Sequence, residues 1–420
     1  MNLQTRAVGV AAAFSISLLA WAGPSTVPAQ GVTPDAEATQ AAAWVASQLA
    51  AGGDVIVTTG ATDWGSTIDA IFALASVGVG GDQLQASAAK LDASGEAYIG
   101  AGDAVLSSWS SIAKMTLGLV VAGLDPSAFP TPDGPRNLVD DLASAMQPDG
   151  SFGDPLAVYG DNVYSHPLAL LALARAGASI PAVAISWLED QQCTDSSSPN
   201  YGSYGWANDC SAPDTDSTAM VVQALEAAGV AADQASVAQA LTWLSAQQSP
   251  SGGFASSFGG VNANSTGLAA QALGDAQATK AAAGWLGGLQ VTCATVASHP
   301  KQLSAADLGA IAYDAAGFAA LTRSGLKASL TQTTLATVQA VLGLGGPSFA
   351  TLSADGIQAN LPSLKCQSPV APAGPRTSDT GGAVVTTPGG LLPIAGLLLL
   401  VVAVVAVRRQ MVRADADRVR

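Results

Sequence analysis

The sequence predicts an all-α fold in which six helical hairpins close into a ring. A unit of two helices repeats along the chain with a mean spacing of about 48 residues. Such a fixed period is typical of repeat architectures. The composition is low in aromatic (5%) and charged (11%) residues and rich in Ala and Gly, which suits closely packed helices. An open solenoid needs polar end caps, whereas a closed ring does not. We therefore expect an α6/α6 toroid of six helical hairpins, followed by a single C-terminal transmembrane helix.

The hairpins can be placed along the chain by their spacing. First helices are expected near residues 44, 86, 142, 187, 243 and 285. Second helices align without gaps on one apolar column, formed by Leu74, Leu119, Leu173, Leu225, Leu273 and Tyr313. In five of the six, a Gly that can end a helix follows four residues later. The sixth second helix is thus predicted from Ser304 to Gly317, residues 95–98 are predicted to form a loop, and residues 326–342 to form a further helix.

The second helices begin with polar residues. In the fourth, Asp214 to Leu225, Asp216 or Ser217 is predicted to cap the first turn, which stabilises a helix by about 1 kcal/mol. Because the second helices would line the ring, their starts would also form a polar rim where a ligand could bind. The side chains predicted to bind it are those of Asp69, Tyr164, His166, Trp206, Asp216, Thr218, Asn264 and Thr266.

Both ends of the chain read as membrane-targeting segments. Residues 1–22 form a signal peptide, with Arg6, an apolar run and the cleavage site Ala20-Trp21-Ala22. Leu391 to Val407 is an uncharged apolar run that is predicted to span the membrane, and residues 408–420 form a basic tail. By the positive-inside rule this tail is cytoplasmic. The ectodomain (31–366) and a Pro/Gly/Thr-rich stalk (367–390) are then extracellular, which makes this a single-pass cell-membrane protein.

Charge and cysteines agree with an exported chain. The formal net charge of −15 argues against a nucleic-acid partner, which would need a basic surface. Four cysteines in an exported protein predict two disulfides, for which three pairings are possible. We favour Cys193–Cys210, which closes a short loop, and Cys293–Cys366, which ties the end of the ectodomain to its body.

Several motifs resemble a known superfamily. Trp187-Leu188-x3-Gln192, Trp243-Leu244-x3-Gln248 with Gly252-Gly253-Phe254, and Gln147-x2-Gly150-x-Phe152 are similar to the Gln/Trp repeats of the terpenoid cyclase and protein prenyltransferase toroids. The resemblance covers roughly residues 40–320 and implies the α-α toroid fold. It leaves function open, because this ring hosts cyclases, prenyltransferases, cobalamin carriers and complement thioester domains.

Each subfamily implies different site residues. Class II cyclases use Asp-x-Asp-Asp followed by Thr-Ala, and Asp214-Thr215-Asp216-Ser217-Thr218-Ala219 resembles this motif with Ser217 in place of the last Asp. The resemblance implies that Asp216, beside Asp214, would be the acid. Prenyltransferases bind zinc through Asp, Cys and His, but the chain has only His166 and His299, so we predict no metal. The Cys-Gly-Glu-Gln sequence of complement thioesters does not occur.

Secreted cobalamin carriers are the most similar in character. Asn264-Ser265-Thr266 and Asp216-Ser217-Thr218 resemble their helix starts, which implies cobalamin as a candidate ligand. Our leading hypothesis is a membrane-anchored ring that binds a small molecule or a cell-surface partner and is not an enzyme. The alternative is an enzyme that uses Asp216, either as a cyclase-like acid or as a glycoside hydrolase or lyase. In the second case its carboxylate pair would come from Asp149, Asp154, Asp214 and Asp216.

Overall fold

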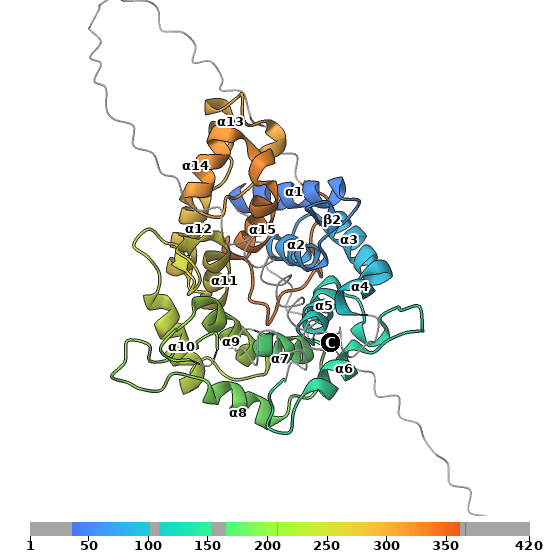
Figure 1. Ribbon diagram of the computed structural model, residues 1–420, viewed down its shortest axis with the longest axis vertical. Coiled ribbons are helices and arrows are strands. Elements are labelled where there is room, and N and C mark those ends of the chain that lie inside the picture. Colours follow the sequence, from blue (N-terminus) through green and yellow to red (C-terminus); the bar gives the residue numbers. More distant parts are fainter. Residues whose placement is uncertain (1–35, 101–108, 153–164, 208, 362–365, 367–420) are drawn as a thin grey trace, which may run out of the picture. The chain divides into compact units, whose positions relative to one another are not determined.

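The computed structural model describes residues 36–100, 109–152, 165–207, 209–361 and 366. The chain divides into two compact units, residues 1–366 and 367–420, and all the described residues lie in the first. They form fifteen α-helices, a few short 3-10 helices and two two-stranded hairpins, so the described part of the chain is mostly helical (Figure 1).

Six inner helices contact one another in a closed cycle. Each packs against the next, and the last packs against the first, so the cycle closes (Figure 1). In chain order they are α2 (Trp64–Val77), α5 (Trp109–Ala122), α7 (Ser165–Arg175), α9 (Thr215–Ala227), α11 (Ala263–Leu273) and α15 (Leu330–Ala340). The predicted toroid is therefore present in the described residues.

The outer helices precede the inner ones along the chain and surround them. They are α1 (Ala36–Ala51), α3 (Gly81–Ser94) with the single turn α4 (Glu96–Ile99), α6 (Leu138–Ala145), α8 (Ala182–Asp190), α10 (Ala235–Ala246) and α12 (Ala276–Gly287). Residues 95–98, predicted to be a loop, lie partly in α4. That prediction is wrong because the short segment folds into one helical turn, which packs against α3 and α5.

Shorter elements connect the helices. The strands form two antiparallel hairpins, β1 (Val57–Thr58) with β2 (Ala61–Thr62) and β3 (Phe254–Ala255) with β4 (Val261–Asn262). The 3-10 helices are η1 (Pro126–Ala128), η2 (Ala305–Asp307), η3 (Leu326–Ser329) and η4 (Val341–Gly343), and α13 (Cys293–Ser298) and α14 (Ala315–Ser324) follow α12. Each β hairpin lies just before an inner helix, so both mark the end of the ring where the inner helices begin. We name this end the N-terminal mouth.

The glutamines of the Gln/Trp repeats join neighbouring hairpins. The Gln192 amide donates to the carbonyls of Gly202 (3.0 Å) and of Ser236 (2.7 Å) in the next outer helix. Gln248 does the same with Gly252 and Ala278. Gln290 donates to Gly309 and to the Glu37 carbonyl of α1, 2.8 Å away, so the same kind of joint links the last hairpin to the first.

A glycine beside each joint permits close packing. Gly309 has φ +94°, and a Cβ on it would lie 2.0 Å from the Gln40 carbonyl oxygen in α1. Gly202 and Gly252 make equally close approaches to α10 and α12. Only glycine tolerates both the positive φ and the contact. The Gly of the repeat motif is thus explained by the packing of a loop on the next outer helix.

One position near the start of the inner helices holds the preceding loop. The hydroxyl of Thr218 accepts from the Tyr204 amide (3.0 Å) and donates to the Asp214 carbonyl (2.8 Å). Equivalent pairs of hydrogen bonds are made by Thr67, Thr266 and Thr337. Because Thr337 belongs to this set, it identifies α15 as the sixth inner helix.

The predicted sixth second helix, Ser304 to Gly317, is wrong. Residues 305–307 form η2. The Ile311 amide donates a hydrogen bond to the Thr337 hydroxyl (2.9 Å), as the Tyr204 amide does to Thr218, so Ile311 belongs to the loop that the sixth inner helix holds. An insertion containing α14 and η3 separates this loop from α15, so Leu344 and not Tyr313 continues the apolar column. The helix predicted over residues 326–342 is confirmed as η3, α15 and η4, and its place in the ring was missed.

Both favoured disulfides are present. Cys193 pairs with Cys210, and Cys293 pairs with Cys366. The second bond joins the residue that begins α13 to the last described residue. It therefore ties the chain beyond the segment that follows η4 back to α13.

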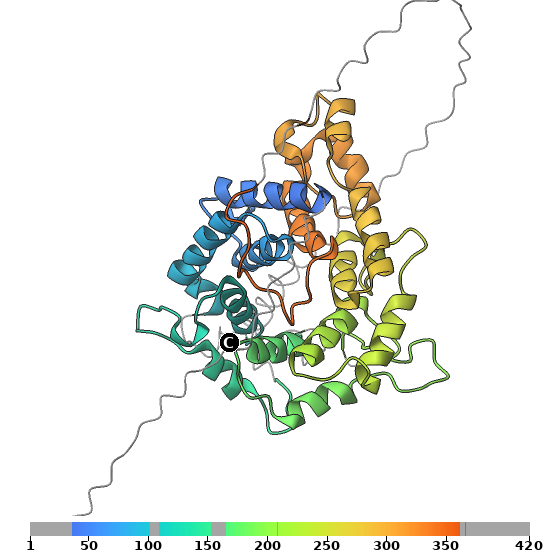
Figure 2. The same ribbon diagram turned by 180° about the vertical axis from the view of Figure 1, so that it is seen from behind.

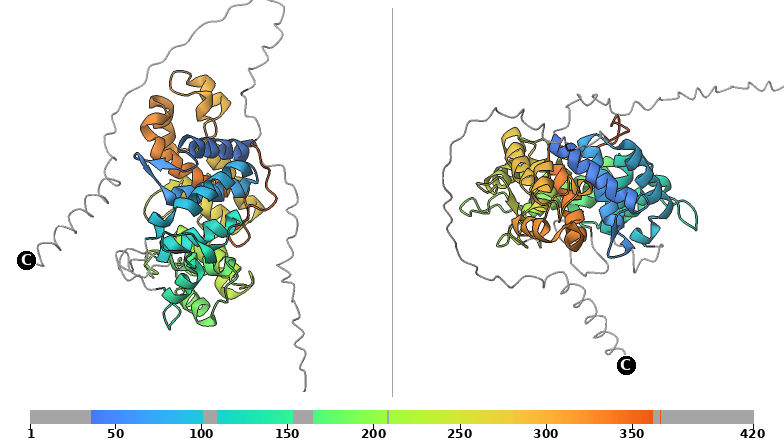
Figure 3. Two further views of the ribbon diagram at one scale, coloured as in Figure 1. Left: turned by 90° about the vertical axis from the view of Figure 1, so that its right-hand side faces the viewer. Right: turned by 90° about the horizontal axis from the view of Figure 1, so that it is seen from above.

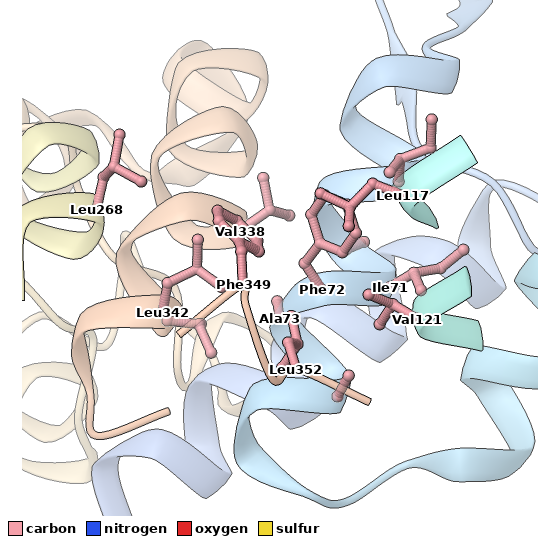
Figure 4. Close-up of a cluster of buried hydrophobic side chains, with 14 of the residues drawn as sticks. Ile71, Phe72, Ala73, Leu117, Val121, Leu268, Val338, Leu342, Phe349 and Leu352 are labelled. Carbon is pink, nitrogen blue, oxygen red and sulfur yellow. The ribbon is translucent and has the colours of Figure 1, made fainter. Parts of the chain in front are cut away.

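That segment, residues 344–361, closes the end of the ring opposite the N-terminal mouth, and we name it the strap. Phe349 and Leu352 are buried among side chains of the inner helices, and the Phe349 ring meets Phe72 edge-on at 5.1 Å (Figure 4). In the view from behind, the strap passes across the centre of the ring (Figure 2). The side view places it on the face opposite the β1–β2 hairpin (Figure 3).

No helix in the described ranges is long and apolar enough to cross a membrane. The predicted signal peptide, stalk, transmembrane run Leu391–Val407 and basic tail all lie outside those ranges.

Candidate functional site

Asp214 caps α9 and also holds the neighbouring β3–β4 hairpin. Its Oδ1 accepts from the Ser217 amide and hydroxyl, both at 2.7 Å. Its Oδ2 accepts from the Ser257 hydroxyl (2.8 Å) and amide (3.1 Å) at the tip of the hairpin. With four donors on two oxygens, this buried carboxylate is fully hydrogen-bonded.

The prediction that Asp216 or Ser217 caps α9 is wrong. Asp214 has the extended backbone of a cap residue, and Asp216 lies two residues further on, inside the first turn. Ser217 donates its hydroxyl to Asp214 rather than accepting from the helix. Asp214, two residues before Asp216, therefore caps the helix. The Asp216 side chain is left available for another role.

Asp216 is an incompletely hydrogen-bonded carboxyl group at the N-terminal mouth. Its Oδ2 accepts from the Ser265 hydroxyl at 3.1 Å, whereas its Oδ1 is buried without a hydrogen-bond partner. Burial raises the pKa of Asp216 to about 7; the negative charge of Asp214 adds to the rise and the Ser265 hydrogen bond opposes it. The group can therefore exchange a proton near neutral pH.

Asn264 occupies the equivalent position on the next inner helix. It lies two residues before Thr266, as Asp216 lies two residues before Thr218, and α9 packs against α11. The Asn264 Oδ1 is also buried without a partner. Two neighbouring inner helices thus present unpartnered polar oxygens at the same level of the mouth.

Aromatic side chains lie beside these oxygens. Phe258, at the tip of the β3–β4 hairpin, is 69% exposed, and its ring meets that of Trp206 edge-on at 5.3 Å. Burial raises the pKa of the Tyr313 phenol, and the negative charge of the nearby Asp216 raises it further. Ser257 joins this hairpin to Asp214 by a hydrogen bond. The Phe258–Trp206 pair therefore belongs to the same region as the two carboxyl groups.

Asp69 lies on a different arc of the ring. Its carboxylate pairs with Lys114 of α5 at 2.7 Å and accepts from the Gln339 amide of α15 at 3.3 Å. Asp69, Lys114 and Gln339 occupy one equivalent position on three neighbouring inner helices. The same position on the other three is apolar: Leu168, Met220 and Leu268. The ring is therefore polar on the α15–α2–α5 arc and apolar below Asp216.

The remaining predicted site residues have roles in the fold. Thr218 and Thr266 hold loops, as described above. His166 replaces Thr at that position: its Nδ1 accepts from the Phe152 amide (3.2 Å), and its ring stacks on Trp187 at 4.0 Å. Burial lowers the pKa of His166 to about 3, so the ring is neutral at physiological pH. Tyr164 lies outside the described residues.

Other site types find little support in the described part of the chain. No group of three or more His, Cys, Asp or Glu side chains there is placed to hold a metal ion. A pocket of about 340 Å³ lies between α11, α12 and the residues after η4, with Lys280 as its charged group. It is remote from Asp216 and offers no carboxylate, so we place the candidate site at the N-terminal mouth.

Sequence reasoning missed the residues that define the environment of Asp216. Ser257 and Ser265 contact the two carboxyl groups from the next hairpin along the chain, 43 and 49 residues away. The repeat gave a signal for Ser265, because it aligns with Ser217 and Ser66. Ser257 and Tyr313 have no such signal, since each lies in a loop whose path depends on the fold.

No family model matches the sequence, and no curated protein matches it. Solved structures are similar in fold. A protein from Actinoplanes has 17% identity and a TM-score of 0.49, with 73% of this chain and 99% of that chain covered. An apo type II terpene cyclase from Scytonema has 16% identity and a TM-score of 0.46, over 73% of this chain and 96% of that one.

Haptocorrin in complex with cobinamide is also similar in fold. It has 16% identity and a TM-score of 0.40, with 79% of this chain and 72% of that chain covered. All three TM-scores are below 0.5, so the assignment of the α-α toroid rests on the helix contacts described above. At such low identity the similarity concerns the arrangement of helices alone.

Proposed function

We propose that this chain is a membrane-anchored, extracellular toroid that binds a small molecule at its N-terminal mouth. The observation that supports this most is the pair of buried, unpartnered oxygens, Asp216 Oδ1 and Asn264 Oδ1, on neighbouring inner helices. A buried polar atom without a partner costs about 1–3 kcal/mol, so a partner for each of these two oxygens would be favourable. A ligand that supplies hydrogen-bond donors would provide such partners.

The two oxygens indicate the chemistry of the ligand. Asn264 Oδ1 can only accept, so the ligand must offer an N–H or O–H group there. Asp216 can accept when ionised or donate when protonated, and its pKa of about 7 makes both forms available. Amides and hydroxyls suit this pair. Corrinoids are the first molecules to test, because the helix starts at residues 216–218 and 264–266 resemble those of cobalamin carriers.

Replacement of Asn264 by Leu tests this proposal. Leu has the same number and branching of side-chain heavy atoms and removes an unsatisfied buried oxygen, so the variant should be at least as stable as the wild type. It should bind the ligand at least tenfold more weakly. The measurement is a thermal-shift and calorimetric titration of the full chain in detergent with cyanocobalamin, cobinamide and a panel of amide-bearing metabolites. Asp275→Asn, in an exposed cap of α12, is the matched control that should change neither property.

If Asn264→Leu lowers stability and leaves binding intact, the oxygen has a structural role and the proposal fails. It also fails if no molecule of the panel, and none retained by the purified protein in native mass spectrometry, binds in a way that depends on Asp216 or Asn264.

A second candidate function is acid catalysis by Asp216. A carboxyl group acts as a general acid only while it is protonated, and the buried position of Asp216 meets this need near neutral pH. Asp214 is unsuited to be the second carboxylate of a glycoside hydrolase, because both its oxygens are occupied by Ser217 and Ser257. The geometry therefore disfavours the Asp214–Asp216 pair for a two-carboxylate mechanism and leaves Asp216 as a proton donor.

Asp216→Asn separates the two functions. Asn keeps the shape of the side chain and an accepting oxygen, so ligand binding should persist within about tenfold, whereas any proton transfer should be lost. Product analysis after incubation with polyprenyl and oligosaccharide substrates is the measurement. Turnover by the wild type that disappears in Asp216→Asn would make the protein an enzyme and displace the binding proposal.

The location of the protein is part of the same proposal. It is supported by the signal-like residues 1–22, the apolar run 391–407 and the two disulfides, which persist in oxidising compartments. Protease treatment of intact cells should remove the 31–366 domain and leave a membrane-bound fragment that contains residues 408–420. Protection of the domain from protease would contradict this location.

A further inference from the structure

The strap is held by side chains from three successive inner helices. Both terminal nitrogens of the Arg175 guanidinium in α7 donate to strap carbonyls, at 2.6 Å to Phe349 and 2.7 Å to Leu352. Gln223 in α9 accepts from the Phe349 amide at 2.8 Å. Gln271 in α11 donates to the Pro347 carbonyl at 2.9 Å. All four contacts are made to the main chain of the strap.

The strap also contacts the other inner helices through its main chain. The Ala354 amide donates to the Val121 carbonyl at the end of α5, and the Gln358 amide donates to the Gly78 carbonyl at the end of α2. These are helix-end carbonyls that have no partner within their own helix. Since the strap begins directly after α15 and η4, it touches or continues every inner helix of the ring.

Two apolar side chains anchor the strap. Residues 348–352 form a single turn in which the Ser348 carbonyl accepts from the Thr351 and Leu352 amides. Phe349 and Leu352, three residues apart, lie on the inner side of this turn and are 6% and 0% exposed (Figure 4). Main-chain hydrogen bonds combined with two apolar anchors are the usual chemistry of peptide recognition.

Removal of the strap would take hydrogen-bond partners away from polar side chains at this end of the ring. With the strap in place Gln223 and Gln271 are 0% and 3% exposed, and without it the Gln223 oxygen and the Gln271 amide would lose their partners. Arg175 is partly buried, and burial lowers the pKa of its guanidinium. Three polar side chains at this end of the ring therefore have the polar main chain of the strap as their hydrogen-bond partner.

We propose that the end of the ring opposite the N-terminal mouth is a peptide-binding site, occupied in this chain by its own strap. The peptide it recognises is a turn of the pattern Ser-Phe-x-x-Leu, bound by its main chain to Arg175, Gln223 and Gln271. The strap is then a displaceable occupant, and a partner that presents the same turn competes with it.

Competition depends on how firmly the strap is held. The strap is tethered by η4 at one end and by Cys293–Cys366 at the other, so its effective concentration at the site is of the order of millimolar. A free peptide therefore competes poorly with the intact strap. Loss of both anchors, by Phe349→Ala and Leu352→Ala in the chain, would weaken the strap and leave Arg175, Gln223 and Gln271 in place.

Fluorescence anisotropy of a labelled peptide with the sequence of residues 346–354 tests the proposal. We expect the full chain carrying Phe349→Ala and Leu352→Ala to bind this peptide at least tenfold more tightly than the wild-type chain. A peptide with Ala in place of Phe349 should bind neither. Phe254→Ala, which removes a buried Phe beside the opposite end of the ring, is the matched control and should not increase binding.

Equal binding of the peptide by the wild type and a folded double variant would overturn the proposal, and so would no binding to that variant. If the double variant does not fold, amide hydrogen exchange in the wild type decides. Exchange of the Phe349 and Ala354 amides at least tenfold faster than the slowest α2 amides would show a strap that opens by itself. Exchange at the global unfolding rate would mean a permanent part of the fold.

Discussion

Asp214 and Asp216 lie two residues apart at the start of α9 and have opposite environments. Asp214 accepts four hydrogen bonds, from Ser217 and Ser257, whereas Asp216 accepts one from Ser265 and has a buried oxygen with no partner. The first carboxylate stabilises the fold, and the second is left incompletely satisfied. Such a division is typical of a site in which one residue positions and its neighbour reacts or binds.

Asp216 should make the protein less stable as the pH rises towards neutrality. Its pKa is about 7 in the folded state, against an ordinary value of 3.8, so between these values the folded state binds more protons than the unfolded state. The free energy of unfolding should then fall by about 1.4 kcal/mol per pH unit from pH 4 to pH 7 and level off above. Urea titrations of wild type and Asp216→Asn across this range measure it.

In those titrations the Asn variant should lack this slope and be the more stable protein above pH 7. Identical pH profiles for the two proteins would show that Asp216 has an ordinary pKa and is not buried as described.

His166 should have the reverse effect. Its pKa is lowered to about 3, so below pH 6.5 the unfolded state binds the proton that the folded state rejects, and stability is lost as the pH falls. His166→Thr restores the residue found at the equivalent position of four inner helices and keeps an acceptor for the Phe152 amide. We expect it to remove the acid-induced loss, at a cost of about 1–3 kcal/mol at pH 7 from the lost stacking on Trp187.

Asp214→Ala should destabilise the protein more than Ser257→Ala. The first removes the cap of α9 and leaves donors of Ser217 and Ser257 without an acceptor, for which we expect about 2–4 kcal/mol. The second removes one hydroxyl contact, worth about 1 kcal/mol. Urea unfolding at one pH gives both values. Equal losses in the two variants would mean that the cap contributes nothing.

Gly309→Ala should be far more damaging than Gly177→Ala. Both glycines have positive φ, but a Cβ on Gly309 would meet the Gln40 carbonyl at 2.0 Å, whereas one on Gly177 would meet nothing within 4 Å. We expect about 1 kcal/mol for Gly177→Ala from backbone strain alone, and more than about 3 kcal/mol for Gly309→Ala, because α1 must move. Similar melting temperatures for the two variants would contradict close packing where the ring closes.

The repeat in the sequence predicted most of the ring and failed where local contacts are replaced by distant ones. Five inner helices follow from the apolar column, and four of these also from the Gly that comes four residues later. The sixth was displaced because an insertion separates Ile311 from Thr337, and the apolar column was continued across it to Tyr313 instead of Leu344. The pairing that reveals the sixth helix spans 26 residues, beyond the reach of helical periodicity.

The candidate site stays a prediction, and sequence and structure contribute different parts of it. The polar starts of the inner helices located the mouth, and the motif at residues 214–219 drew attention to Asp216. Which of Asp214 and Asp216 caps the helix depends on where the helix begins, and sequence patterns leave that uncertain by one or two residues. The role proposed for Asn264 rests on its side-chain oxygen having no hydrogen-bond partner, which only the packed structure shows.

The free energy of unfolding of Asn264→Leu, compared with that of the wild type without ligand, tests the central claim most directly. If the buried Asn264 oxygen binds a ligand and has no partner without it, its removal should raise the unfolding free energy by about 1 kcal/mol or more. The reason is that the folded state no longer contains a desolvated oxygen without a hydrogen bond. A fall of similar size would contradict the claim, since it would show that the oxygen is already satisfied within the folded chain.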